Sequence, residues 1–514
     1  MLNKKLKKLI RDPNLFFSDM VLKQKKKYAH FYTKKVDGHY NYTIVSAVYN
    51  VQDYLDDYFK SIINQTLNFK KHIKLILIDD GSTDKSAAII KKWANKYPRN
   101  ITYVGKENGG QASARNMGLN YVNTEYVTFL DPDDFLDKEY FYQVDDFLNK
   151  HKNVNFATSN IIFYVEKSKK YSDTHPLRQK YKNGDVLLPF NQSYSEIQLS
   201  ASSSIFKTQY INNNSIRFNT DVKPNFEDGR FICEYLLSLS SGDVAFLQSA
   251  KYFYRKREDG SSTLDSAWSK LERFTHVPKY GYLYILEQAL TKFGNVPIFI
   301  QKSILYEMVW NIKYIVNHPE RLGLLSELQK KEYFEDIKKI FSYLDAETIL
   351  KFSSAGCWFY HKVGMLACFK NEVPLNKISY IENYDAKKDL VLIRYFTKDL
   401  VTEHIYADGA DQIPLYAKTI THDFIDNVFI LERRLWVSVK NIKHMKFFVS
   451  GVQTKISLNG KQRADGINID DIKKHFINII PKYKRDEKYQ NSWVLMDRDS
   501  QADDNAEHFY RYIS

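Results

Sequence analysis

In this 514-residue chain, pairs of acidic residues follow apolar stretches, and the spacing within these pairs would allow them to bind a cation or transfer a proton together. In Asp131-Pro132-Asp133-Asp134, two carboxylates separated by one residue stand at a tight turn. Such a pair can share a hard divalent cation that also bridges phosphate oxygens. The alternative is an Asx turn that caps a loop, because Asp is common in turns. Asp131 and Asp133 are therefore candidate metal ligands, and their assignment depends on where the fold places them.

Two further polar clusters have similar surroundings. Asp79-Asp80 follows an apolar run, and a carboxylate there can accept a hydrogen bond from the ring N–H of uracil or cap the following helix. Asn108-Gly109-Gly110 precedes Ala114-Arg115-Asn116. Glycine lets a backbone approach a ligand closely, and Arg115 could hold a phosphate or steer an Asp.

A third acidic pair, Glu227-Asp228, lies far downstream and precedes an apolar helical pattern. Acidic residues often stand at a helix N-terminus because the helix dipole favours negative charge there. The alternative is a catalytic pair, in which one carboxylate is the general base and the other positions it. Both interpretations stay open on residue patterns alone.

Alternating strands and helices position these clusters. Apolar runs predict strands at 43–48, 73–78, 101–104 and 126–130, and helical periodicity predicts helices at 52–66, 84–96 and from about 112. This alternation implies a parallel, doubly wound sheet. Ligands bind such sheets beyond the carboxyl ends of the strands, and the clusters fall there.

The remaining chain has other patterns. Residues 265–370 show helical periodicity, residues 388–460 alternate like an antiparallel β domain, and Asn459-Gly460 predicts a hairpin turn. Residues 1–27 hold nine basic and two acidic residues around apolar positions at helical spacing. They predict a basic amphipathic helix on a lipid surface, or a solvated arm packed on its own domain.

Composition narrows the partners and the compartment. The net charge of +14 favours anionic lipid or a phosphate-bearing substrate, and no usual nucleic-acid motif is present. Three cysteines without metal-ligand spacing fit a reducing cytoplasm. We find no signal peptide and no membrane-spanning run, so we expect a cytoplasmic protein, peripheral at the inner face of the cell membrane. An oligomer stays open, because residues 265–370 offer apolar surface.

Taken together, the motifs resemble those of the inverting family 2 glycosyltransferases of the GT-A fold. The matching residues are Val48-Tyr49-Asn50, Ile62-Ile63-Asn64-Gln65-Thr66, Asp79-Asp80-Gly81-Ser82-Thr83-Asp84, Asn108-x-Gly110, Ala114-Arg115-Asn116-x-Gly118, Phe129-Leu130-Asp131-Pro132-Asp133-Asp134, Asn214-Ser215-Ile216-Arg217-Phe218, Phe226-Glu227-Asp228 and Tyr254-Arg255-Lys256-Arg257 with Ser261-Ser262. One departure is Ala47, where the family usually has proline. The resemblance implies an α/β fold, Rossmann-like, with a mostly parallel sheet and flanking helices.

The resemblance also implies a UDP-sugar donor and a role for each motif. The residues that would bind the nucleotide sugar are Val48, Tyr49, Asn50, Asp79, Asp80, Asn108, Gly110, Arg115, Asp131, Arg257 and Ser262, with Asp80 at uracil, Asp131 at ribose, and Arg257 and Ser262 over the diphosphate. Asp133, with Asp131, would hold Mn²⁺ or Mg²⁺. Asp228 would be the general base, with Glu227 beside it, in a direct displacement that inverts the anomeric centre.

Weaker likenesses concern the two ends. Pro13-x-x-Phe16-Phe17 looks like the start of bacterial capsule-assembly enzymes, and residues 493–497 with 503–510 resemble the opening of CDP-glycerol glycerophosphotransferase domains of teichoic-acid type. We expect a basic N-terminal segment (1–39), a GT-A domain (40–265), a helical region (266–380), a small antiparallel β domain (381–485) and the start of a truncated further domain (486–514). Such a chain would not itself transfer glycerol phosphate.

The expected function is transfer of a hexose or N-acetylhexosamine from a UDP-sugar to a hydroxyl of a growing capsule-like or teichoic-acid-like polysaccharide. An anionic glycan or polyol phosphate would be the acceptor. The alternatives are a lipopolysaccharide-modifying or protein-modifying glycosyltransferase of the same fold, and a non-catalytic scaffold. The complete carboxylate set disfavours the scaffold.

Overall fold

The computed structural model describes residues 35–191, 193–257, 266–372 and 377–477. These residues divide into two compact units. The first runs to residue 372 and includes 397–399 and 421–431, and the second holds the other described residues from 377 onward. The predicted amphipathic segment at 1–27 and the resemblance at 493–510 lie outside the described residues.

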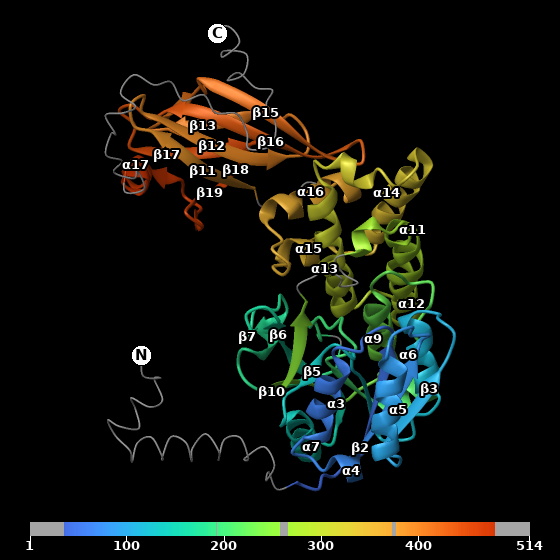
Figure 1. The fold of residues 1–514 in the computed structure, drawn as a ribbon. Helices are drawn as coiled ribbons and strands as arrows, with labels where there is room; N and C mark the ends of the chain where they lie inside the picture. The colour runs from blue at the N-terminus through green and yellow to red at the C-terminus, as the bar shows by residue number, and fades with distance from the viewer. Residues whose placement is uncertain (1–34, 192, 258–265, 373–376, 478–514) are drawn as a thin grey trace, which may run out of the picture. The chain divides into compact units, whose positions relative to one another are not determined.

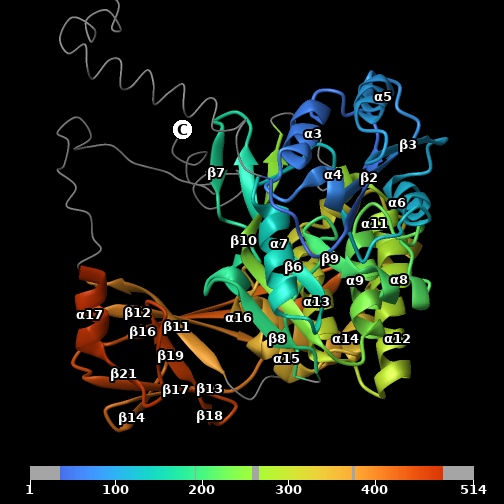
Figure 2. The same ribbon diagram turned by 90° about the horizontal axis from the view of Figure 1, so that it is seen from below.

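A ten-stranded mixed sheet forms the centre of the first unit, in the order β3-β2-β1-β4-β9-β6-β10-β5, with β7 beside β6 and β8 beside β10 (Figures 1 and 2). The four predicted strands are confirmed and run parallel: β1 (Tyr42–Val48), β2 (Ile73–Asp79), β3 (Ile101–Gly105) and β4 (Tyr126–Phe129). The other strands are β5 (Phe135–Leu136), β6 (Val154–Val165), β7 (Lys170–Ser172), β8 (Val186–Pro189), β9 (Ser204–Lys207) and β10 (Asp243–Lys256). Strand β9 runs antiparallel to β4 and β6, which makes the sheet mixed.

Helices flank this sheet. They are α3 (Leu55–Ile63), α4 (Phe69–His72), α5 (Ser86–Lys96), α6 (Gln111–Leu119), α7 (Tyr140–Lys150), α8 (Thr208–Asn213) and α9 (Glu227–Ser238). Helix α6 packs on β1 and β2. A Cβ atom on Gly118 would lie 2.4 Å from Cγ1 of Val45, so only glycine allows this close approach. Gly118 thereby sets the depth at which α6 places Arg115.

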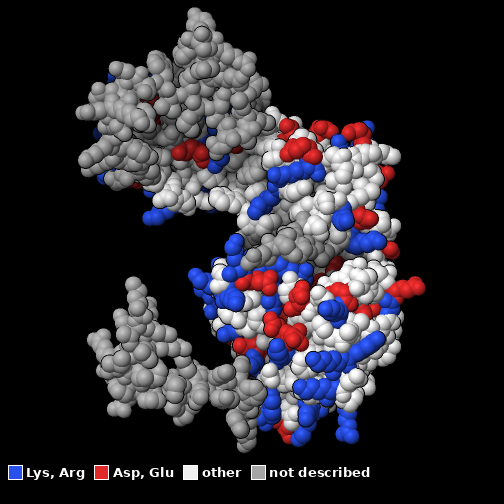
Figure 3. Space-filling view, viewed as in Figure 1, with Lys and Arg blue, Asp and Glu red and all other residues white. Residues whose placement is uncertain are grey.

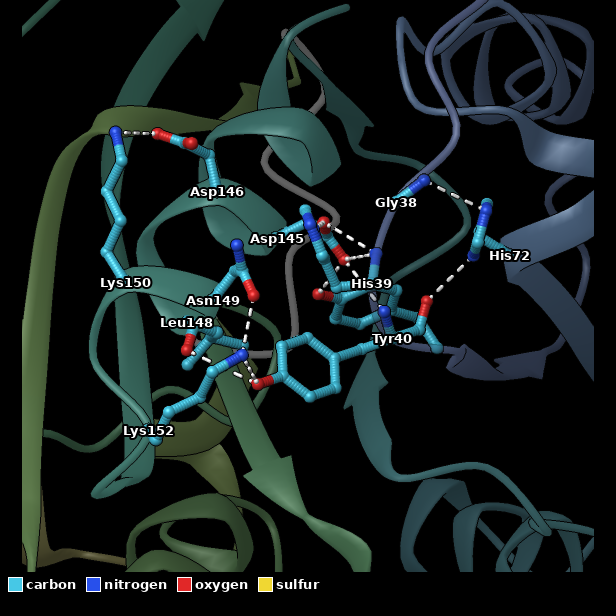
Figure 4. Close-up of polar contacts among 11 residues, drawn as sticks. Gly38, His39, Tyr40, His72, Asp145, Asp146, Leu148, Asn149, Lys150 and Lys152 are labelled. Atoms are coloured by element: carbon cyan, nitrogen blue, oxygen red, sulfur yellow. Dashed lines mark hydrogen bonds and ion pairs between the residues drawn. The ribbon is translucent and has the colours of Figure 1, made fainter.

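A group of hydrogen bonds fixes the amino end of β1 (Figure 4). The Asp145 carboxylate of α7 accepts hydrogen bonds from the N–H groups of His39 and Tyr40, at 2.9 and 3.1 Å. His72 Nε2 accepts from the N–H of Gly38 at 2.9 Å, and Nδ1 lies 3.0 Å from the Tyr40 carbonyl oxygen. Since Nε2 accepts, Nδ1 carries the proton and donates to that carbonyl. The chain therefore enters the sheet in a fixed register.

The helical region also belongs to the first unit. It consists of η2 (Ala267–Ser269), α11 (Glu272–His276), the π-helix η3 (Val277–Leu283), α12 (Tyr284–Phe293), α13 (Ile298–Ile315), η4 (Pro319–Leu322), α14 (Glu327–Ser342), α15 (Ala346–Lys351) and α16 (Phe359–Lys370). The π-helix packs on Phe226, whose Cδ1 lies 3.0 Å from a Cβ built on Gly281. Arg273 donates to Asn225 Oδ1 at 2.8 Å. These contacts fix the backbone that leads into α9.

The second unit contains most of two further sheets. Their strands are β11 (Ile378–Asp385), β12 (Leu390–Thr397), β13 (Glu403–Ala407), β14 (Ala410–Gln412), β15 (Tyr416–Phe424), β16 (Asn427–Ser438), β17 (His444–Val449), β18 (Val452–Gln453), β19 (Lys455–Leu458), β20 (Lys461–Arg463) and β21 (Ile467–Asn468), before α17 (Ile469–Ile477). Asn459 and Gly460 both have positive φ, at 49° and 75°, so the predicted hairpin turn is confirmed between β19 and β20. Strands β11 and β19 pair in parallel, so the pairing is not antiparallel throughout.

No helix within the described residues combines the length and the apolar character needed to cross a membrane.

Candidate active site

The carboxyl ends of β1, β2 and β4 bring the predicted clusters to one edge of the sheet. Val48 at the end of β1 pairs in register with Asp79 at the end of β2. Beyond β1, the N–H of Asn50 donates to Ser82 Oγ at 3.1 Å, and Asn50 Oδ1 accepts from the N–H of Thr83 at 2.8 Å. Tyr49, which lies between Val48 and Asn50 in the sequence, is about half exposed at this edge.

Asp79 and Asp80 organise the neighbouring loops. Asp79 accepts from the N–H of Ser82 and from the hydroxyl of Tyr103, both at 2.9 Å. Asp80 accepts from the N–H groups of Gly109 and Gly110, at 3.0 and 2.7 Å, and from Lys106 Nζ at 2.6 Å. The predicted motif residues at 80 and 108–110 are therefore joined in one structure, with Asn108 in the loop that Asp80 holds.

Arg115 lies beneath the site and joins two of its carboxylates. Its guanidinium is 2% exposed and stands over the rings of Phe129 and Phe218, at 5.8 and 5.2 Å from their centroids. It donates to Asp131 Oδ1 at 2.8 Å and also to Asp228 Oδ1. This single side chain brings together acidic motifs that lie far apart in the sequence.

A loop of small residues, Ser200–Ser204, completes the setting of the same two carboxylates. The N–H of Ala201 donates to Asp228 Oδ2 at 2.9 Å, and Ser202 Oγ donates to Asp131 Oδ2 at 2.7 Å. Sequence reasoning missed these residues. The run Ser-Ala-Ser-Ser-Ser was the available signal, because small polar residues permit close backbone approach, but it has no specific spacing.

The turn after β4 separates its carboxylates by function. Asp134 is buried and accepts from the Tyr252 hydroxyl at 2.5 Å and from the Arg255 N–H at 2.7 Å, which ties the turn to β10. Asp133 instead pairs with the Arg257 guanidinium at 2.5 Å. Asp133 and Arg257 are thus brought together, whereas Ser262 lies outside the described residues.

The acidic groups share a partly desolvated site, and this perturbs them. Burial raises the pKa of Asp133, and the neighbouring Asp131 charge raises it further. Burial also raises the pKa of Glu227, to about 8, with the adjacent Asp228 charge as the second cause. The pKa of Asp228 is raised by burial, against which the Arg115 charge acts. Such crowding favours a site that receives a cation or protons during its chemistry.

The donor set fits one divalent cation at Asp133. No group of three or more His, Cys, Asp or Glu side chains forms a metal cage in the described part of the chain. Both oxygens of Asp131 already accept hydrogen bonds, from Arg115, Ser202 and also from Gln111 Nε2 at 3.0 Å. Mg²⁺ and Mn²⁺ sites often use one or two carboxylates and take their remaining ligands from phosphate and water, which is the arrangement that Asp133 permits.

Residues 43–209 match the family model described as glycosyl transferase family 2. This segment is a family 2 glycosyltransferase domain. Asp228 and Arg257 lie beyond the matched residues, so their place in the site rests on the contacts given above. The predicted family and the GT-A type of fold are confirmed, with the helical region and β-rich sheets following the family 2 domain.

The chain is related to teichoic acid biosynthesis proteins. It is 30% identical over 455 residues to the minor teichoic acid biosynthesis protein GgaB of Bacillus subtilis (strain 168), which covers 86% of this chain and 47% of GgaB. The chain thus spans about half the length of that relative. It is 29% identical over 314 residues to GgaA of the same organism, which covers 60% of this chain and 68% of GgaA. A crystal structure of S. aureus TarS 1–349 with UDP-GlcNAc superposes with a TM-score of 0.47 at 17% identity, over 64% of this chain and 87% of that one.

Proposed function

We propose that this chain transfers a hexose or N-acetylhexosamine from a UDP-sugar to a hydroxyl of a teichoic-acid-like or capsule-like polymer, with inversion at the anomeric carbon. The observation that carries the proposal is the Arg115 bridge between Asp131 and Asp228. It sets a donor-side carboxylate and a candidate base at one edge of a family 2 domain. A non-catalytic scaffold would have no need to keep two desolvated carboxylates on one buried arginine.

The donor end of the site is the edge beyond β1 and β2. We propose that Tyr49 covers the uracil ring and that Asp80, in the loop it shares with Asn108 and Gly110, accepts from the ring N–H. Asp131 would accept from a ribose hydroxyl while Arg115 and Ser202 hold its orientation. Arg115 then supports the nucleotide through Asp131, because its guanidinium is buried beneath that carboxylate.

The catalytic end is the start of α9. Asp228 would take the proton from the acceptor hydroxyl as that oxygen attacks the anomeric carbon, from the face opposite the nucleotide. Two donors, Arg115 and the Ala201 N–H, hold the Asp228 carboxylate in one orientation. Glu227 stands beside it at the first position of the helix. The bond from the anomeric carbon to the diphosphate oxygen breaks as the new glycosidic bond forms.

The leaving diphosphate needs positive charge. Arg257 stands at Asp133 and can donate to phosphate oxygens when the donor binds. A Mn²⁺ or Mg²⁺ ion held by Asp133 would supply further positive charge to the same oxygens. The names of GgaB and GgaA support a teichoic acid as the product class, and the net charge of +14 suits a phosphate-bearing acceptor inside the cytoplasm.

The test is a donor screen by UDP release, with common UDP-sugars, Mn²⁺ and a glycerol-phosphate oligomer as acceptor. We expect turnover with one sugar class, and loss of turnover in Asp133→Ala and Asp228→Asn. Asp146→Ala is the matched control, because among the described residues this carboxylate forms an ion pair only with Lys150 on the same helix, α7. Absence of any thermal shift with UDP or UDP-sugars would overturn the proposal. Transfer to a neutral glycan but not to the oligomer would overturn the acceptor assignment.

A further inference from the structure

The opposite edge of the same sheet carries a group of exposed basic side chains. Exposed lysines on α4, β2 and α5, with an arginine in the loop after α5, surround the amino end of β2, and we call them the basic edge: Lys70, Lys71, Lys74, Lys92, Lys96 and Arg99. Figure 3 shows Lys and Arg side chains gathered over the region where Figure 1 labels α4 and α5. Their concentration there is a local feature beyond the net charge of the chain.

Backbone and aromatic contacts hold these residues together. Asn100 donates through Nδ2 to the carbonyls of Phe69 and Ile73, at 3.0 and 2.9 Å. The rings of Phe69 and Tyr97 meet edge to face with centroids 5.5 Å apart. The end of α5 is thus packed on α4 and on the start of β2, so the basic edge is one surface of a rigid core.

Few carboxylates oppose this charge. Asp37 pairs with Lys71, but within the described residues no carboxylate forms an ion pair with Lys70, Lys74, Lys96 or Arg99. Lys96 Nζ stands 5.1 Å from the centroid of Trp93, a partly exposed aromatic of the same helix. Lysines beside an amphipathic aromatic ring are the composition that suits a lipid headgroup layer.

We propose that the basic edge docks this protein on an anionic lipid bilayer. The chain enters the fold at the same place, because Val36 bridges to Leu67 just before α4. Residues 1–27, which lie outside the described residues, hold nine basic and two acidic residues and so add charge of the same sign to the chain. Each lysine near an anionic membrane contributes about 1 kcal/mol, so a group of five or six suffices for stable, salt-sensitive binding.

Docking by this edge has a consequence for the active site. The basic edge lies at the amino end of β2 and the site lies at its carboxyl end, seven residues away. At about 3.3 Å per residue the two edges are roughly 20 Å apart. A docked protein would therefore face its donor site away from the lipid, open to the nucleotide sugar.

The test is sedimentation of the full chain with vesicles of phosphatidylglycerol and phosphatidylcholine. The triple variant Lys70→Ala, Lys74→Ala, Lys96→Ala is expected to bind about 100-fold more weakly at low salt, since about 1 kcal/mol per lysine is about fivefold per lysine. The control Lys331→Ala, Lys418→Ala, Lys461→Ala removes equal charge from exposed positions on other elements and should change binding less than about threefold. Wild-type binding should fall at high salt and vanish on pure phosphatidylcholine.

Several results would overturn the inference. They are equal binding by the triple variant and the wild type, an equal loss in the control variant, and binding of a single-stranded oligonucleotide or soluble poly(glycerol phosphate) at the basic edge while vesicles stay unbound. UDP binding that vesicles block would refute the outward-facing site. Vesicle binding is measured without turnover, so it stands or fails separately from the proposed transferase activity.

Discussion

Replacing Arg115 with methionine tests whether the site depends on the buried bridge between Asp131 and Asp228. Methionine keeps much of the volume between Phe129 and Phe218 but removes both ion pairs. Removing one partner of a buried pair costs about 3–5 kcal/mol. The Asp131 and Asp228 side chains keep 27% and 20% of their exposure, so water relieves part of the cost and we expect about 3 kcal/mol.

The same substitution should change the pH dependence in a definite direction. The Arg115 charge lowers the pKa of Asp228 against the effect of burial, so its removal raises that pKa further. A raised carboxyl pKa in the folded state gives stability that is present at low pH and lost as pH rises through the folded value. The loss of thermal stability in Arg115→Met should therefore be smaller at pH 5 than at pH 7.5.

Activity follows from the same argument. If Asp228 is the base, its deprotonated form is the active one, so the acid limb of kcat should move to higher pH by about one unit or more in Arg115→Met. Loss of orientation at the base should lower kcat by about 100-fold at neutral pH. Arg115→Lys, which keeps the charge but cannot bridge two carboxylates, should recover the pH limb more than kcat.

The measurements are UDP affinity, kcat and melting temperature across pH for wild type, Arg115→Met and Arg115→Lys. A positioning role predicts that kcat falls while UDP affinity changes less than about threefold. The reasoning is refuted if UDP affinity collapses while kcat and its pH profile stay unchanged, because Arg115 would then contact the nucleotide directly.

Further substitutions probe separate features. Ser202→Ala should weaken UDP-sugar affinity by about tenfold, because it releases one Asp131 oxygen. The control Ser203→Ala should leave that affinity unchanged. If the two variants raise the KM for the UDP-sugar equally, the Ser202–Asp131 contact is not the cause. Gly118→Ala should lower the free energy of unfolding by about 1–3 kcal/mol, because the new methyl group would lie 2.4 Å from Val45 Cγ1. Thermal unfolding measures this loss, and an unchanged melting temperature would show that α6 can shift away from β1. Burial lowers the pKa of Lys180 to about 7, so above that pH the unfolded chain binds more protons than the folded chain. The free energy of unfolding of the wild type should therefore rise from pH 7 to pH 9. The rise should be smaller in Lys180→Met, which lacks the titrating group. Asp133→Asn should remove any Mn²⁺-dependent increase in UDP affinity, which calorimetry with and without the metal measures, and a retained increase would place the cation elsewhere.

The strands that carry the donor site could be predicted, because each is a short apolar run followed by polar residues. Strands β1 to β4 begin and end within one or two residues of the predicted positions. The π-helix at Val277–Leu283 could not be found in the same way. Periodicity indicates a helix there, but it detects neither a widened turn nor the close approach of Gly281 to Phe226.

The half of the sheet formed by β9, β6 and β10 was not predicted, and the reason is physical. Strand β9 is only four residues long, and its position between β4 and β6 is set by packing from distant parts of the chain. Local patterns report which residues favour an extended backbone, but not which strand they pair with. The loop that precedes β9 was therefore missed, although Ala201 and Ser202 contact both carboxylates at the centre of the site.

The antiparallel strand β9 places the Ser200–Ser204 loop at the point where two acidic motifs of this chain meet. The parallel strand β4 delivers Asp131 to the carboxyl edge of the sheet, and the antiparallel β9 brings the loop before its first residue to the same edge. Because β9 begins there, Ser200–Ser204 lies beside Asp131, and α9 follows closely enough in the chain for Asp228 to reach the same loop. Arg115 then needs only one buried position to hold both carboxylates. The antiparallel β9 and the buried Arg115 together therefore join two separate acidic motifs into one site.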